Sequence, residues 1–289
     1  MTAEFERVQA VVEERLGEYF TEKVSYTILL ESMRYSLVPG GKHIRAVLCI
    51  KFCEAAGGKQ ESALEAACAI EMLHTYSLIH DDLPCMDDDD MRRGRPSNHV
   101  RYGEYTATLA GDALQAAAFG TLLNSRIPPD RVVDMAGILA DAAGPHGICG
   151  GQYLDLFGEG KQQTLSELME INALKTSALI SASARIGVIA AGGSREQIKA
   201  AGEYAQAVGS AFQVRDDLLD CMASMEELGK PVGSDKKRDK ATFATLLSID
   251  ECERRINEET DKAIAALYGK FPDSGFLIWL ARMLAERRY

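Results

Sequence analysis

Hydrophobic residues recur at spacings of three and four along almost the whole chain, and alanine is frequent between them. This spacing matches the 3.6-residue turn of an α-helix, and the strict alternation that marks half-buried strands is missing from the sequence. The pattern therefore predicts an all-α protein. We expect helices at 4–20, 25–36, 42–56, 60–83, 103–124, 130–143, 149–157, 164–191, 194–222, 238–247, 249–268 and 275–287.

The eight prolines fall at the edges of these periodic segments. Proline removes a backbone donor and clashes with the preceding helical turn, so this placement supports the predicted boundaries. The notable loops are expected at 84–100 and 223–237. Because no fixed-period repeat, low-complexity tract or change in composition divides the sequence, we expect residues 1–289 to form one domain.

The balance of charge and hydrophobicity narrows the class of protein. Lysine and arginine number 32 against 43 acidic residues, a net charge of −11, and 46% of residues are hydrophobic. These values predict a soluble globular protein and argue against a nucleic-acid partner, because an acidic surface repels phosphate backbones.

Cysteines and the N-terminal sequence indicate the compartment. Seven cysteines, an odd number, lie mostly inside apolar helical runs, which favours a reducing environment. The first residues are acidic and unlike a signal or transit peptide, and the apolar runs are too short or too interrupted to predict a membrane span. We therefore expect a cytoplasmic protein.

The most unusual segment follows the predicted helix 60–83. Six aspartates fall within the ten positions 81–90, and three arginines follow at 92, 93 and 95. Two carboxylates about 4 Å apart repel by roughly 4 kcal/mol at an effective dielectric of 20, so such a cluster requires cations. A divalent metal is the natural counter-ion, although a solvated acidic loop is the alternative for this segment alone.

A second group of aspartates lies inside an apolar helix at Asp216, Asp217 and Asp220. Asp216 and Asp220 share a helix face because they are four residues apart. Acids on an apolar helix are costly to bury unpaired. If this helix faced the first cluster, their oxygens would form a cage suited to Mg²⁺.

Basic residues occur where a phosphate would need them. Lys42 and Arg45 follow Gly40-Gly41 at the start of a predicted helix, where positive charge is unfavourable unless an anion binds. His74 precedes Asp81 by two helical turns on the same face. The pair His80-Asp81 also allows a metal-dependent phosphohydrolase, but only five histidines are available as ligands.

These motifs together resemble the trans-polyprenyl diphosphate synthase family, in particular its bacterial farnesyl diphosphate synthases. The resemblance covers essentially the whole chain and includes Gly151-Gln152-Tyr153-Leu154-Asp155-Leu156, Lys175-Thr176 and Gln213-Val214-Arg215-Asp216-Asp217. It implies a single-domain isoprenoid-synthase helical bundle around a central cavity, with the two aspartate motifs facing each other across its mouth. It also implies a homodimer.

The reaction implied by the resemblance is the condensation of isopentenyl diphosphate with dimethylallyl or geranyl diphosphate. Mg²⁺, three ions with substrate bound, would promote departure of the allylic diphosphate, and cationic side chains would stabilise the leaving group. The implied metal ligands are Asp81, Asp82, Asp87, Asp216 and Asp220. The implied catalytic and allylic-substrate residues besides Asp81 and Asp87 are Arg92, Lys175, Thr176, Gln213, Lys230 and Lys240.

Isopentenyl diphosphate would be held by a separate basic set, namely Gly41, Lys42, Arg45, His74 and Arg93. The family commonly has Arg and Pro where this chain has His43 and Ala46, and Arg215 replaces a frequent neutral residue. None of these departures removes an implied metal or phosphate ligand.

Product length in the family depends on bulk at the fourth and fifth residues before the first aspartate, here Ser77 and Tyr76. A helical rise of about 1.5 Å per residue puts Tyr76 roughly 7.5 Å below Asp81. The Tyr-Ser pair favours (E,E)-farnesyl diphosphate, C15. The alternatives are a geranylgeranyl or geranyl diphosphate synthase and a non-catalytic subunit; a phosphohydrolase and a terpene cyclase fit the motifs less well.

Overall fold

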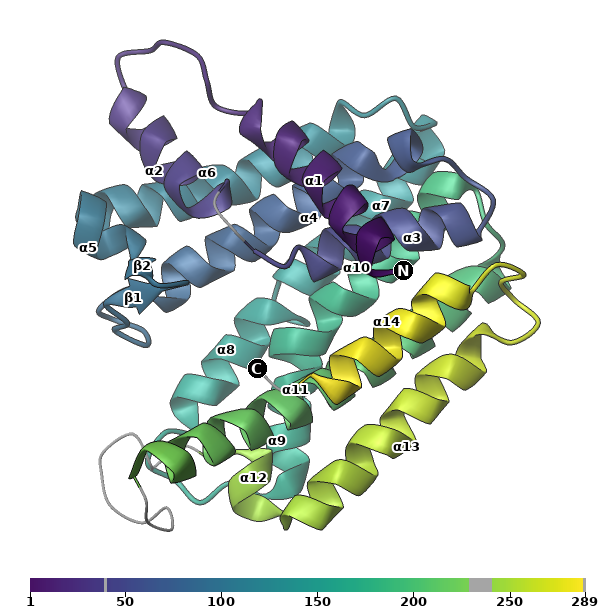
Figure 1. Ribbon diagram of the computed structural model, residues 1–289. Helices are drawn as coiled ribbons and strands as arrows, with labels where there is room; N and C mark the ends of the chain where they lie inside the picture. Colours follow the sequence, from purple (N-terminus) through teal and green to yellow (C-terminus); the bar gives the residue numbers. More distant parts are fainter. Residues whose placement is uncertain (39–40, 229–240, 288–289) are drawn as a thin grey trace. The chain divides into compact units, whose positions relative to one another are not determined.

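The computed structural model describes residues 1–38, 41–228 and 241–287, with side chains from 223 to 228 left out. Its main elements are helical, which confirms the predicted all-α class (Figure 1). The helices are α1 (Thr2–Gly17), α2 (Thr27–Leu37), α3 (Ile44–Ala55), α4 (Gln60–Asp81), α5 (Asn98–Tyr102), α6 (Glu104–Leu123), α7 (Pro129–Ala143), α8 (Ile148–Phe157), α9 (Leu165–Asn172), α10 (Ala178–Ala191), α11 (Arg195–Leu228), α12 (Phe243–Leu246), α13 (Ile249–Leu267) and α14 (Gly275–Glu286).

The chain divides into two compact units. The first comprises Met1–Leu139 and Ile186–Gly193 and is built around α4, whose central turns are almost wholly buried against α3 and α6. Gly111 on α6 permits this packing, because a Cβ there would lie 2.2 Å from Nε2 of His80. The C-terminal end of α4, which carries the first aspartates, is thereby fixed to α6.

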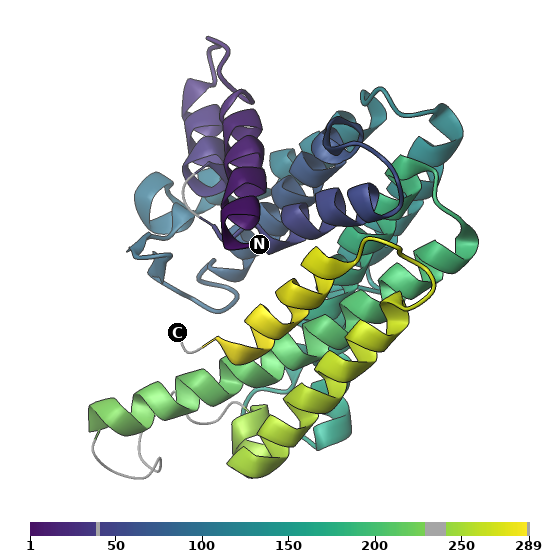
Figure 2. The same ribbon diagram turned by 45° about the vertical axis from the view of Figure 1, so that its right-hand side comes forward.

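The second unit comprises Ala140–Arg185 and Ser194–Tyr289. Its long helix α11 packs against α13 and α14, which lie beside it in both views (Figures 1 and 2). Tyr204 of α11 is fully buried, and its hydroxyl donates to the carbonyl of Leu277 in α14 at 2.7 Å. This packing holds the aspartates of α11 on a rigid element. Whether the two units form one domain stays a prediction.

Several boundaries differ from the prediction. The helix expected at 103–124 is preceded by a separate α5, because Gly103 has a φ of 85° and breaks the path between the two helices. Helix α11 continues to Leu228, so the loop predicted from 223 begins as helix, and the rest of that loop lies outside the described residues. The expected helix 164–191 contains a π-helical turn, η1 (Ala173–Ser177).

The loop predicted at 84–100 contains a small antiparallel hairpin of β1 (Met91–Arg92) and β2 (Arg95–Pro96). Arg93 and Gly94 both have positive φ, 52° and 72°, and so form its tight turn. In a separate test of length and composition, Leu165–Ala191 is apolar enough to cross a membrane, yet 67% of its most apolar window is buried. Core helices of soluble proteins pass the same test.

Candidate active site

The first aspartate motif is a compact turn at the end of α4. The backbone amide of Asp87 donates to the carbonyl of Asp81 at 2.9 Å, and Asp88 adopts a left-handed φ of 51°. The turn therefore returns the chain to the end of the helix. Oδ1 of Asp87 is buried and accepts no hydrogen bond. An unpartnered, buried carboxylate oxygen is an available ligand for a hard cation.

Asp82 is 2% exposed and binds the guanidinium of Arg92, with Nε 2.9 Å from its Oδ1. Arg92 also reaches Oδ2 of Asp89 at 3.3 Å. Burial raises the pKa of Asp82, although the hydrogen bond and charge of Arg92 oppose that rise. The structure thus gives Asp82 a role in positioning Arg92, and its assignment as a metal ligand stays a prediction.

Replacing Arg92 with methionine is expected to destabilise the fold by about 2 kcal/mol near neutral pH, because it leaves the buried Asp82 carboxylate uncompensated. Without the arginine, the pKa of Asp82 would lie still further above its unfolded value, so the loss should shrink as the pH falls and Asp82 becomes protonated. Urea unfolding at pH 7 and pH 4.5 measures both effects. The double variant Asp82→Asn with Arg92→Met should recover most of the lost stability, and an additive double variant would contradict the pairing.

The basic residues of the first unit converge as predicted. Nη1 of Arg45 lies 3.2 Å from Nε2 of His74, and a Cβ on Gly41 would meet the Arg93 guanidinium at 3.1 Å. Gly41 is therefore needed for the close approach of Arg93. Lys42, next to Gly41, is exposed.

Electrostatics make this basic cluster receptive to an anion. Burial, followed by the charges of Arg45 and Arg93, lowers the pKa of His74 well below its usual range, so its ring is neutral. Burial also lowers the pKa of Arg45, and Nε of Arg45 is buried without a hydrogen-bond partner. A bound diphosphate would neutralise the crowded guanidinium groups and accept from the free N–H.

In the second unit, Lys175 and Thr176 lie on the π turn η1. Gly151 of α8 permits its close packing, because a Cβ there would meet the backbone nitrogen of Lys175 at 2.3 Å. Nζ of Lys175 binds Oδ2 of Asp155 at 2.8 Å. Thr176 donates to the side-chain oxygen of Gln213 at 3.2 Å. The predicted pair of Thr176 and Gln213 is thus in direct contact.

This network continues along α11. Nε2 of Gln213 donates to Oδ1 of Asp217 at 2.9 Å, and the backbone amide of Phe243 donates to the other oxygen at 2.7 Å. Burial raises the pKa of Asp217. These side chains border a cavity of about 260 Å³, lined also by Lys175 and Asp155. The cavity places a cation, a hydroxyl and an amide around one space.

Asp216, the first acid of the second motif, forms an ion pair with Arg287 from the end of α14. The Arg287 guanidinium lies 3.9 Å from the centre of the Phe212 ring. Asp220 is exposed on the same helix. Among the described residues, no three His, Cys, Asp or Glu side chains are grouped closely enough to hold a metal by themselves.

A polyprenyl synthetase family model matches residues 26–273. The chain belongs to this family. It is 42% identical over 285 residues to a farnesyl diphosphate synthase of Geobacillus stearothermophilus, covering 98% of this chain and 96% of that one. It is 44% identical over 245 residues to a chloroplastic geranylgeranyl pyrophosphate synthase of Capsicum annuum, covering 84% and 66%. An apo FPP/GFPP synthase structure from Zymomonas mobilis aligns with a TM-score of 0.88 at 32% identity, covering 98% of both chains.

As a polyprenyl synthetase, the protein is a prenyltransferase of isoprenoid biosynthesis. The family binds diphosphate through divalent metal. The residues of the first motif fit such an ion, since the free Oδ1 of Asp87 is a hard oxygen donor in a turn that also contains Asp81. Relatives include farnesyl and geranylgeranyl synthases, and some are chloroplastic, so product length and the cytoplasmic location stay predictions.

The remaining predicted positions have mixed outcomes. Tyr76 is 5% exposed, and its ring lies edge-on to that of His80 with centroids 5.7 Å apart. Ser77 is also buried and donates to the carbonyl of His74 at 2.8 Å. Lys230 and Lys240 lie outside the described residues.

The sequence reasoning missed two side chains that contact predicted site residues. Arg287, which pairs with Asp216, has no sequence signal beyond its basic C-terminal position. Glu71 precedes His74 by three residues and could have been found as an acid on an otherwise apolar helix. A search for charged residues inside predicted core helices would have selected it.

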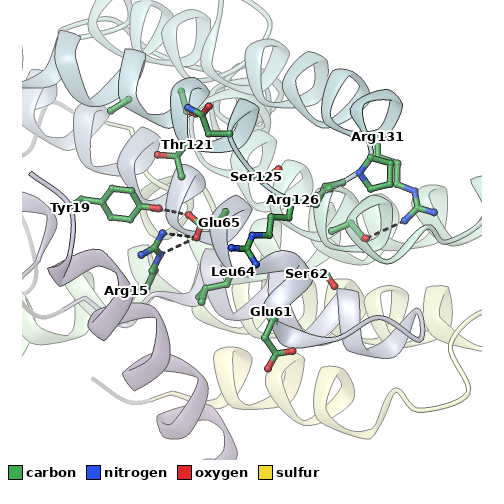
Figure 3. Close-up of a pocket in the computed structure, with 16 residues that line it drawn as sticks. Arg15, Tyr19, Glu61, Ser62, Leu64, Glu65, Thr121, Ser125, Arg126 and Arg131 are labelled. Carbon is green, nitrogen blue, oxygen red and sulfur yellow. Dashed lines mark hydrogen bonds and ion pairs between the residues drawn. The ribbon is translucent and has the colours of Figure 1, made fainter.

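A further cavity, of about 940 Å³, lies in the first unit near the N-terminal end of α4 (Figure 3). Glu65 lies at its edge, where its carboxylate accepts hydrogen bonds from Arg15 and Tyr19. Sixteen residues of helix separate Glu65 from Asp81, roughly 24 Å at 1.5 Å per residue. This cavity is therefore separate from the motif residues.

Proposed function

We propose that this protein is a Mg²⁺-dependent farnesyl diphosphate synthase that condenses isopentenyl diphosphate with dimethylallyl and then geranyl diphosphate. The observation that carries the proposal is the division of labour between adjacent residues in the first unit. Arg92 binds the aspartate motif through Asp82, whereas Arg93 packs on Gly41 in the basic cluster. One diphosphate would be bound through metal at the acidic motif, and the other directly by cations.

Each group of side chains has a task in this proposal. The acidic motif residues Asp81 and Asp87, with Asp216 and Asp220, hold Mg²⁺, which supplies Lewis-acid stabilisation of the allylic diphosphate; we expect three ions. Arg92 and Lys175 donate to that diphosphate as its bond to the allylic carbon breaks. We assign the same task to Lys230 and Lys240, which lie outside the described residues.

Isopentenyl diphosphate is held by Lys42, Arg45, neutral His74 and Arg93. Its double bond then attacks the allylic cation, a carbon–carbon bond forms, and a proton leaves to the released diphosphate. The oxygens of Thr176 and Gln213 are placed to stabilise the positive charge. Because the reactants are held in place and water is excluded, much of the rate comes from orientation.

The C15 product is the finer part of the proposal. The buried ring of Tyr76 supports it, since an aromatic at this depth on α4 would stop a growing tail early. A geranylgeranyl product is the second candidate, favoured by the 44% identity to the Capsicum annuum enzyme. A homodimer and a cytoplasmic location belong to the same proposal.

Product analysis tests the function. Purified protein with Mg²⁺, isopentenyl diphosphate and dimethylallyl or geranyl diphosphate is expected to yield farnesyl diphosphate, and a chelator should abolish it. A C20 product would replace the farnesyl assignment with the geranylgeranyl one. Release of phosphate without a new carbon–carbon bond would indicate a hydrolase, and no reaction at all would indicate a non-catalytic subunit.

A further inference from the structure

Glu71 is a buried acid beside the basic cluster of the first unit. It is 3% exposed and lies on α4, three residues before His74. Burial alone would raise its pKa, but the hydrogen bond from His43 and the charges of His43 and Arg45 keep that pKa below its ordinary value. Glu71 is thus a carboxylate in a cluster otherwise built of cations and a neutral imidazole.

Both oxygens of Glu71 bind the segment that carries Lys42 and Arg45. Oε2 lies 2.8 Å from Nδ1 of His43, and Oε1 accepts the backbone amide of Ala46 at 3.2 Å. His43 directly follows Lys42, and Ala46 directly follows Arg45. One carboxylate therefore fixes the chain next to each of the two cations.

His43 needs this fixation because its backbone is strained. It adopts a left-handed φ of 44° immediately before α3, a conformation that side chains other than glycine rarely take. Its ring is buried, with Nε2 3.5 Å from Oε1 of Glu13 in α1. A ring between two carboxylates is best satisfied as the charged imidazolium.

We propose that Glu71 and His43 are positioning residues for isopentenyl diphosphate, fixing Lys42 and Arg45 in the geometry that binds its diphosphate. This inference rests on the proposed function. Neither residue is required to touch the substrate. The Glu71 carboxylate holds the entry to α3, and the His43 charge keeps that carboxylate satisfied.

The proposal predicts a pH dependence. Imidazole titrates near neutrality, so loss of the His43 proton at rising pH leaves Glu71 without its charged partner. The other charged and titratable groups around this ring are Glu13 from α1, His74 from α4, Arg93 from the hairpin, and Lys42 and Arg45 beside it in sequence. The arginines keep their charge throughout this range. Binding of isopentenyl diphosphate is therefore expected to weaken as the pH rises from 6 to 8.

Three variants test the pair by titration calorimetry with isopentenyl diphosphate and by steady-state kinetics. Glu71→Gln is expected to raise Kd and KM for isopentenyl diphosphate by about tenfold or more, as the loss of a charge-assisted hydrogen bond predicts. KM for the allylic substrate should stay unchanged and kcat should change by less than about threefold. His43→Gln should show the same weak binding at all pH values. His43→Arg should bind tightly with little pH dependence.

Glu65→Gln is the matched control. Glu65 lies on the same helix and its carboxylate is bonded to Arg15 and Tyr19 beside the separate cavity (Figure 3). Its replacement is expected to lower thermal stability as much as Glu71→Gln does, but to leave binding of isopentenyl diphosphate unchanged. A purely structural role for Glu71 would make the two variants alike.

The outcomes separate this inference from the proposed function. Wild-type protein that binds isopentenyl diphosphate without condensing it would overturn the farnesyl synthase proposal, while a tenfold loss in Glu71→Gln would still support the positioning role. Normal condensation with unchanged binding in Glu71→Gln would overturn the positioning role alone. Equal losses in Glu65→Gln and Glu71→Gln would also overturn it, and wild-type protein that does not bind the substrate would overturn both.

Discussion

Replacing Asp87 with asparagine is expected to lower kcat for condensation by about a thousandfold, because it removes one charged oxygen ligand where negative charge develops on the leaving group. The side chain keeps its shape, so the fold should be retained. Oδ1 of Asp87 is buried and unpartnered, which means that no protein contact is lost with the charge. Steady-state rates over a range of Mg²⁺ concentrations measure the effect.

Asp88→Asn provides the control for this variant. Asp88 is the next residue, is exposed, and has a left-handed φ that asparagine tolerates well. It should retain nearly the full rate. Titration of Mn²⁺ in the presence of inorganic diphosphate gives a readout independent of turnover, and Asp87→Asn should bind the ion more weakly. Equal rates in the two variants would remove Asp87 from the metal site.

Replacing Tyr76 with alanine is expected to lengthen the product from C15 to C20 or beyond. The ring is buried on α4 about 7.5 Å below Asp81, so its removal would open space for another isoprene unit. Loss of a buried aromatic also costs about 3–5 kcal/mol of stability, so the assay should be run well below the measured Tm. Chromatography of the dephosphorylated products with excess isopentenyl diphosphate measures the chain length.

Tyr76→Phe separates bulk from the hydroxyl in this prediction. It keeps the ring that lies edge-on to His80 and should still release C15. Ser77→Ala removes only the hydroxyl that bonds the His74 carbonyl, and no change in product is expected. If Tyr76→Ala released only C15, the tail would be stopped by another side chain.

Helical periodicity allowed most of the fold to be predicted. Long segments such as α4 and α11 repeat their apolar spacing over several turns, so their positions follow from the sequence. Boundaries were less certain where one residue decides them, as at Gly103. The hairpin of β1 and β2 was missed, because strands of two residues carry no periodicity and only the Arg93-Gly94 turn defines them.

For the site, residue types predicted the chemistry better than the partners. Charged residues in unusual places, such as Arg45 at a helix start, pointed to an anion, and the structure places this arginine against His74. Pairings between distant segments could not be predicted, because sequence spacing reports only neighbours on one element. Asp82 was expected to face metal but is held by Arg92, and Asp216 is held by Arg287.

The π turn η1 has a consequence for how this chain can vary. A π turn accommodates one more residue than the α-helix around it, and such turns often occur at functional sites. Lys175 and Thr176 reach Asp155 and Gln213 from within that turn. Deleting a single residue there would restore regular helix and rotate everything beyond it by about 100° relative to α9. We therefore expect substitutions within 173–177 to be tolerated far better than any change in its length.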